Sequence, residues 1–272
     1  MTSGSESLIF SHIELSTLLG GVLRSVGDYS TAEAVLQTAL DSSTEKFGNR
    51  HHATAISANA LGVLYKSLGR FDEARKLYDI ALDALDGKAS NTAANLFHNI
   101  AGLEHVAGSS IRAVIAARKG LEIRRSTYGE SHPLVAADLS NLGGILFADA
   151  TEEAGGCFAQ ARDIFARTYG PRHPEVAVSI NNLAALAHRK GCFSEAEALY
   201  REGISIQEEK LGCSHLDVQV SYYNLAKLLI VMKRSSEALP LLTKTIENLS
   251  KMVSDDHHIL RLSRRLLGQV RI

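Results

Sequence analysis

Regularly spaced asparagines are the side chains of this sequence best suited to recognition chemistry. Asn99, Asn141, Asn182 and Asn224 follow one another at intervals of 42, 41 and 42 residues, inside otherwise apolar, alanine-rich segments. A side-chain amide offers both a donor and an acceptor, and burying it without a partner costs free energy. A series of such amides could therefore pair with the N–H and C=O groups of an extended peptide, whatever the side chains of that peptide.

Histidine also recurs, and histidine side chains could bind a metal ion. Five of them precede apolar segments at matching positions: His51, His52, His132, His173 and His215. Neighbouring helices pack about 10 Å apart, well beyond the ~2 Å of metal coordination. Histidines from successive segments are therefore not expected to share an ion, and we predict no metal site and no cofactor.

Catalytic motifs are not found. The sequence contains no Gly-rich phosphate loop, no GxSxG and no HExxH, and its three cysteines form no CxxC pair. His98 with Tyr223, or His188 near Cys192, could be proposed as acid and base, but each occupies a position that recurs along the chain. An enzyme is therefore the least favoured class of protein, and no catalytic residue is predicted.

These residues belong to a repeat of about 42 residues. Its first block reads NNLAAL, YNLAKL, SNLGGI or HNIAGL, and two earlier copies without the second asparagine begin at Thr17 and Asn59. The second block, as in GRFDEARKLY, has a glycine before a new amphipathic segment, which indicates a helix end and a tight turn. The third block, as in YGPRHP, places proline at the first turn of the next helix. Each repeat thus predicts a helix, a turn and a helix.

This combination resembles the tetratricopeptide repeat, most closely its 42-residue variety found in kinesin light chains, over nearly the entire chain. The resemblance implies an all-α fold, a right-handed superhelical solenoid of six helix-turn-helix units with a C-terminal capping helix. Small side chains at one position of the second helices would allow close helix packing. These are Ala32, Ala74, Ala113, Ala154, Ala196 and Ala238.

The repeat also predicts the organisation of the chain. We expect residues 1–8 to be disordered, residues 9–256 to form the solenoid, and residues 257–272 to form the capping helix. The six units are expected at approximately 9–50, 51–90, 91–131, 132–172, 173–214 and 215–256. Residues 86–91 and 148–156 depart from the repeat, and we expect the solenoid to bend there.

The resemblance implies that the first helix of each unit lines a concave groove and that its asparagines contact bound peptide. The predicted peptide-binding residues are Asn59, Asn95, His98, Asn99, Asn141, Asn182, Arg189, Tyr223, Asn224 and Lys227. Cations near the ends of first helices, such as Arg24 and Lys66, favour an acidic or carboxylate-bearing peptide. Two interpretations remain open, because the amides could equally bond to the neighbouring repeat. Asn181 is expected to face water.

Charge and hydropathy exclude several kinds of partner. The formal net charge is −1, so neither nucleic acid nor a membrane surface is predicted as a partner. No apolar segment reaches the ~20 residues that span a bilayer, and a cytoplasmic location is expected. Arginines in two helices are predicted to be solvated: Arg112, Arg118, Arg124, Arg125, Arg261, Arg264, Arg265 and Arg271. The apolar residues of the last helix predict a monomer or a weak homodimer through that helix.

The sequence therefore favours a non-catalytic protein–protein interaction module that binds a peptide segment of another protein, as an adaptor, scaffold or regulatory subunit. An alternative is a peptide-sensing regulator that acts through a partner, because no effector segment is left over between the repeats. An enzyme within a repeat shell is the third possibility.

Overall fold

The computed structural model describes residues 2–149, 151–255 and 257–270, and within these ranges every regular element is a helix. The all-α prediction is therefore confirmed. The helices form two compact units, one ending at Glu130 and one beginning at Ser131. Each unit is described by itself.

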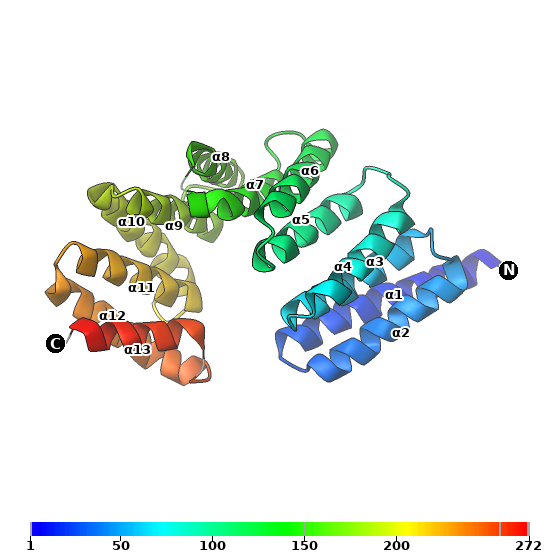
Figure 1. Cartoon of the computed structure of the whole chain (residues 1–272), viewed down its shortest axis with the longest axis horizontal. Coiled ribbons are helices and arrows are strands. Elements are labelled where there is room, and N and C mark those ends of the chain that lie inside the picture. The colour runs from blue at the N-terminus through cyan, green and yellow to red at the C-terminus, as the bar shows by residue number, and fades with distance from the viewer. Residues whose placement is uncertain (1, 150, 256, 271–272) are drawn as a thin grey trace. The chain divides into compact units, whose positions relative to one another are not determined.

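The N-terminal unit consists of antiparallel helix pairs (Figure 1). The pairs are α1 (Thr2–Ser25) with α2 (Tyr29–Phe47), α3 (His52–Ser67) with α4 (Phe71–Leu85), and α5 (Asn91–Val106) with α6 (Ser110–Tyr128). The second helices α2 and α4 also pack on the pair that follows each of them, and the first helices α1, α3 and α5 contact one another in order.

The C-terminal unit repeats the same arrangement. Its pairs are α7 (Pro133–Leu146) with α8 (Glu152–Tyr169), α9 (Pro174–Arg189) with α10 (Phe193–Leu211), and α11 (Leu216–Val231) with α12 (Ser235–Met252). A short 3-10 turn, η1 (Phe147–Asp149), follows α7, and α13 (His258–Val270) packs on α11 and α12. First helices α9 and α11 also touch each other.

The turns within the pairs are built as the glycines predict. Gly27, Gly69, Gly108 and Gly191 all have φ between 75° and 84°. At the second turn, the N–H of Arg70 donates to the carbonyl of Tyr65 at 2.9 Å, which is the bond that closes a Schellman helix end. A left-handed residue is needed there, and glycine adopts that conformation without a Cβ clash.

Small residues form the contact between paired helices. The six alanines predicted at this position of the second helices are each 0% exposed, so their packing role is confirmed. Opposite them, glycines of the first helices lie under large side chains: Gly62 lies against the ring of Tyr78, and Gly143 against the ring of Phe158. Deep burial of these pairs requires one partner to be small, because interiors are close-packed.

Two segments need comment: residues 2–8, which were expected to be disordered, and residues 86–91, where the repeat is irregular. Helix α1 begins at Thr2, so residues 2–8, expected to be disordered, are helical. Serine and glycine are weak helix formers, but adding residues to a helix that has already nucleated gains one hydrogen bond per residue. The irregular segment before the third pair contains a left-handed Asp86 with φ 52° followed by Gly87 with φ 71°.

Candidate functional site

Two amides of the N-terminal unit are bonded to each other. The Nδ2 of Asn99 on α5 donates to the Oδ1 of Asn59 on α3 at 2.9 Å, and both side chains are half-buried. These two predicted peptide-binding residues therefore join consecutive first helices. In this unit the two asparagines hold neighbouring repeats together, which is the second of the two interpretations that the sequence left open.

Asn95 also accepts a hydrogen bond inside the N-terminal unit. The guanidinium of Arg124 on α6 donates to the Oδ1 of Asn95 at 2.6 Å and to that of Asn91 at 2.7 Å. Arg124 is only 4% exposed, so the prediction that it is solvated is wrong. A buried guanidinium needs acceptors, and α5 provides two, of which Asn95 is a position that the sequence pattern assigned to a groove. His98, the next predicted residue on α5, is half-buried.

Asn181 on α9 does not simply face water. Its Nδ2 donates to the Oγ of Ser221 on α11 at 2.8 Å and to the Oε1 of Gln207 on α10 at 3.2 Å. The backbone of Gly203 packs directly against its amide oxygen. Asn181 therefore fixes α9 to α10 and α11, and brings the first helices of two consecutive repeats side by side.

Asn182 and Asn224 differ from the other amides. They occupy the same repeat position on α9 and α11, and both are half-buried. Within the described ranges neither side chain makes a hydrogen bond to another residue. Two amides at equivalent positions on contacting helices are thus left with their donors and acceptors available. Asn141, at the same position on α7, is also half-buried.

Tyr223 and Lys227 lie close to Asn224 in the sequence of α11. Burial raises the pKa of the Tyr223 hydroxyl above its ordinary value. Lys227 is exposed, and no carboxylate of the described chain pairs with it. Burial lowers the pKa of His188 on α9, and the positive charge of Lys227 acts in the same direction. Lys227 thus projects its charge toward the end of α9. We name Asn182, His188, Tyr223, Asn224 and Lys227 the α9/α11 face.

Arg189 has a structural partner. Its guanidinium donates to the carbonyl of Ala148 and lies 5.6 Å from the ring centroid of Phe147. Both belong to η1, the segment where the sequence departs from the repeat. Arg189 therefore holds the irregular end of the preceding pair, a role that its position in the repeat did not reveal.

Two cations lie at the ends of first helices in the N-terminal unit. Burial lowers the pKa of Lys66, and the charge of Arg24 lowers it further. The Nζ of Lys66 would lie 3.4 Å from a Cβ at Gly102 of α5. Neither cation forms an ion pair within the described residues, and both stand in the last turns of their helices, where positive charge is favoured.

The recurrent histidines cap helices. The Nδ1 atoms of His51, His132, His173 and His215 each accept a hydrogen bond from the backbone N–H two residues later, at 3.1 to 3.2 Å. The four residues precede α3, α7, α9 and α11, and each satisfies an otherwise unpaired donor at a helix start. Sequence reasoning assigned them a structural position but missed this bond. No group of three or more His, Cys, Asp or Glu in the described chain could hold a metal ion.

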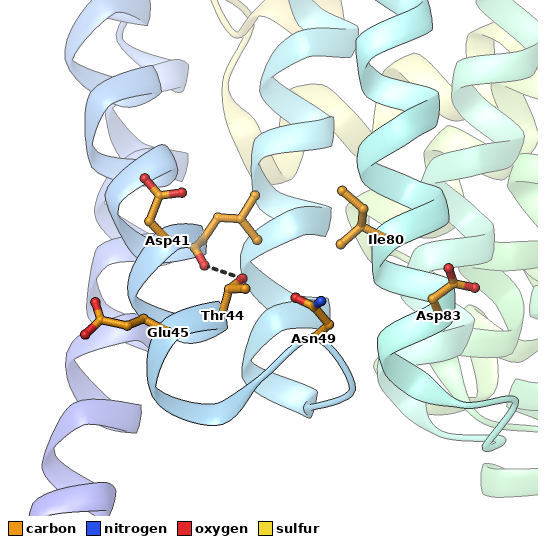
Figure 2. A pocket seen from close by; sticks show the side chains of 7 residues that line it. Asp41, Thr44, Glu45, Asn49, Ile80 and Asp83 are labelled. Atoms are coloured by element: carbon orange, nitrogen blue, oxygen red, sulfur yellow. Dashed lines mark hydrogen bonds between the residues drawn. The ribbon is translucent and has the colours of Figure 1, made fainter.

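Hollows that the sequence did not indicate lie between second helices of the N-terminal unit. Figure 2 shows one of about 680 Å³, where Asp41, Thr44 and Glu45 of α2 and Ile80 and Asp83 of α4 line the walls. Its three carboxylates carry like charge. The walls are therefore suited to a cationic or neutral surface and do not fit an acidic peptide.

A second hollow lies between α4, α5 and α6. Leu82, Phe97 and Lys119 line both of its adjoining parts, of about 340 and 530 Å³. The ammonium group of Lys119 lies 4.9 Å from the ring centroid of Phe97, a distance at which cation and aromatic ring attract each other. This hollow is mainly apolar, and the charges around it are of both signs.

Comparison with known proteins defines the class of protein. A family model described as tetratricopeptide repeat matches residues 13–86, 148–209 and 176–251. These ranges cover more than half of the sequence, so the chain belongs to the tetratricopeptide repeat family, as its repeat pattern predicted. No curated protein matches the sequence significantly. No helix in the described ranges is both long and apolar enough to cross a membrane.

Solved structures share the fold at low sequence identity. BtubC (BKLC) from P. vanneervenii is 18% identical with a TM-score of 0.65, over 90% of this chain and 93% of that one. NprR in complex with its cognate peptide NprX is 17% identical with a TM-score of 0.66, over 95% and 71%. A signal transduction ATPase from Pyrococcus horikoshii with a tetratricopeptide repeat sensor is 15% identical with a TM-score of 0.73, over 94% and 38%.

Proposed function

We propose that this chain is a non-catalytic interaction protein that binds an extended, carboxylate-bearing peptide segment of a partner along the α9/α11 face. The observation that carries the proposal is a contrast among the amides of the first helices. Asn59 and Asn99 are bonded to each other, whereas Asn182 and Asn224 have unused donors and acceptors on contacting helices. Amides at a repeat interface that serve no internal bond are available to a ligand.

The spacing of the two amides suits a peptide backbone. Asn181 and Ser221 hold α9 and α11 together by a hydrogen bond of 2.8 Å, and neighbouring helices in contact lie about 8–10 Å apart. Successive same-facing residues of an extended chain are ~7 Å apart. The backbone N–H and C=O groups of one peptide could therefore form hydrogen bonds with both amides, whatever the side chains of that peptide.

Apolar contacts would supply the affinity that the amides lack. A neutral hydrogen bond contributes only about 1 kcal/mol net, whereas micromolar binding needs about 8 kcal/mol. Val178 is 37% exposed on α9, and the half-buried Val220 and Tyr223 lie on α11. These side chains offer apolar surface next to the amides, and a ligand residue would cover it.

Lys227 gives the proposed preference for a carboxylate. It is exposed and has no acidic partner in the described chain, and the depressed pKa of His188 beside it favours a neutral imidazole. A bound carboxylate would meet an ammonium group and an imidazole that can donate a hydrogen bond. The structural relative NprR, which contains a bound peptide, supports the capacity of this fold for such binding.

The test begins with a displayed library of random peptides that end in a free carboxylate, selected on the wild-type protein. The selected peptide is then titrated against Asn182→Ala with Asn224→Ala, against Lys227→Ala, and against Asn59→Ala as the matched amide control. We expect the double variant to bind at least tenfold more weakly and Asn59→Ala to bind like wild type. Lys227→Ala should bind the peptide with a free C-terminal carboxylate no better than the same peptide with an amidated C-terminus. Equal binding by all variants, after circular dichroism shows equal folding, would reject the α9/α11 face.

A further inference from the structure

Helix α1 carries a second apolar surface that its own unit does not cover. Six aliphatic side chains are largely exposed, which we name the α1 stripe: Leu8 at 73%, Leu15 at 64%, Leu18 at 67%, Leu19 at 49%, Val22 at 59% and Val26 at 72%. Single exposed aliphatic residues are ordinary on protein surfaces, but a contiguous set of this kind marks an interaction site.

The spacing of the α1 stripe places all six side chains on one side of the helix. Positions 8, 15 and 22 are seven residues apart, and 18, 19 and 26 fall on the same side at 100° per residue. The opposite side belongs to the unit's own core: Ile13 is 1% exposed, and Gly20 packs against Leu36 of α2. A helix that is apolar on two opposite sides is suited to burial between two bodies.

The last helix of the chain is built differently. Leu260 of α13 is fully buried, and Leu266 and Leu267 pack on the core around α11 and α12. Its outward positions are the exposed Arg261, Arg264 and Arg265. This is the polar outer surface that a terminal helix of a repeat protein needs. Leu260, Leu266 and Leu267 of α13 are thus used within the C-terminal unit, whereas the α1 stripe is left exposed.

We propose that the α1 stripe binds the α1 stripe of a second copy of this chain, in a two-fold antiparallel pair. Between Ser7 and Val26 the only Asp, Glu, Lys or Arg residues are Glu14 and Arg24, and Arg24 is half-buried on the side away from the stripe. Glu14 is exposed and lies one turn before Leu18, at the edge of the stripe. The six aliphatic positions themselves carry no charge with which to select an acidic or a basic partner. A two-fold contact needs only a surface that is complementary to itself.

The size and symmetry of the α1 stripe agree with this partner. Six aliphatic side chains at roughly 100 Å² each give about 1,200 Å² for two copies, the lower end of stable interfaces. Leu15 and Val22 lie at equal distances on either side of the midpoint between Leu18 and Leu19. An antiparallel pair centred there brings Leu18 and Leu19 of both copies together and places Leu15 opposite the second copy's Val22.

Sedimentation velocity of the full chain tests the pairing. We expect a concentration-dependent dimer for wild type and a monomer for Leu18→Glu with Val22→Glu. The matched control is Ile111→Glu with Ile115→Glu on α6, where both residues are also exposed, at 79% and 61%, and this variant should remain a dimer. A monomeric wild type at high concentration, or equal dissociation of the control variant, would overturn the proposal. Circular dichroism confirms that each variant is folded.

Disulfide crosslinking tests the antiparallel arrangement. In a background with Cys192→Ser and Cys213→Ser, the exposed native thiols are removed. Leu18→Cys should then crosslink two copies on mild oxidation, because its counterpart lies next to the two-fold axis. Leu8→Cys should not, because its counterpart lies about 30 Å away along the helices, far beyond the ~7 Å between the Cα atoms of a disulfide. Crosslinking at position 8 and not at position 18 would contradict the antiparallel pair.

Discussion

The side-chain amide of Asn99 donates to the side-chain oxygen of Asn59 at 2.9 Å, and this bond connects α5 to α3 across 40 residues of sequence. The same residue type that could bind a ligand in one repeat therefore holds the structure together in another. Removing either partner leaves the other half-buried and unpaired, which costs more than the bond itself contributes.

A double-mutant cycle on this pair is the first prediction. Asn59→Ala and Asn99→Ala should each lower the free energy of unfolding by about 1–2 kcal/mol, and the double variant by less than their sum, with a coupling of about 1 kcal/mol. Denaturant unfolding followed by circular dichroism measures all three. Additive effects would show that the two amides do not interact in solution.

Adding a methyl group at Gly62 should destabilise the protein. A Cβ there would lie 2.5 Å from the Cε1 of Tyr78, which is only 2% exposed. We expect Gly62→Ala to cost about 1–3 kcal/mol. The matched control is Gly144→Ala on α7, where a Cβ meets nothing within 4 Å. There alanine should stabilise the helix by about 0.5–1 kcal/mol. The midpoint temperature of thermal unfolding should therefore fall for Gly62→Ala and rise for Gly144→Ala.

The histidine caps predict a specific pattern of substitution. The Nδ1 of His173 accepts from the N–H of Glu175 at 3.2 Å, so His173→Ala should lower the free energy of unfolding by about 1 kcal/mol. His173→Asn should keep the stability of wild type, because the asparagine oxygen can accept the same bond. Equal losses from alanine and asparagine would mean that the imidazole ring stabilises the helix start through its contact with the ring of Tyr169 instead.

Lys233 occupies a position where the turns of four other helix pairs have glycine. Its φ is 61°, and the N–H of the next residue, Arg234, donates to the carbonyl of Leu229 at 2.8 Å, as at the glycine turns. A left-handed conformation costs a non-glycine residue about 1 kcal/mol. Lys233→Gly should therefore raise the midpoint of denaturant unfolding, even though glycine increases the freedom of the unfolded chain. A lower midpoint would show that the aliphatic stem of Lys233 contributes packing.

An inter-repeat ion pair predicts a pH dependence. The guanidinium of Arg234 donates to the carboxylate of Glu197 at 2.5 Å, and this bond, followed by one from Arg201, holds the pKa of Glu197 below its ordinary value of 4.5. The unfolded chain therefore takes up the proton at a higher pH than the folded chain. The stabilisation is complete above the ordinary value and is lost as the pH falls through the lower folded value.

Glu197→Gln tests that dependence. The variant should be less stable than wild type at neutral pH, and the difference should shrink as the pH falls below about 5. Glu195→Gln is the control, because Glu195 is exposed and makes no ion pair with another described residue. A constant difference between Glu197→Gln and wild type at every pH would mean that the carboxylate acts by packing rather than by charge.

The sequence determined most of the architecture because the features that specify it are local and periodic. Gly69 and its counterparts end helices through a conformation that only a few residue types adopt readily. Alanines such as Ala74 and Ala196 recur at the contact between paired helices, since a larger side chain would not fit there. A period of about 42 residues made each observation repeat, so the helix pairs and the family could be predicted from the residues alone.

The tertiary structure alone decided which polar side chains are free. Asn59, Asn99, Asn182 and Asn224 share one residue type and a related place in the repeat, yet the first two bond to each other and the last two have no partner among the described residues. Arg124, predicted to be solvated, is buried against Asn95. A hydrogen bond between residues 29 or 40 positions apart depends on how two helices pack and on which side chains then meet. These contacts between side chains arise from three-dimensional packing, and the periodicity of the sequence does not specify them.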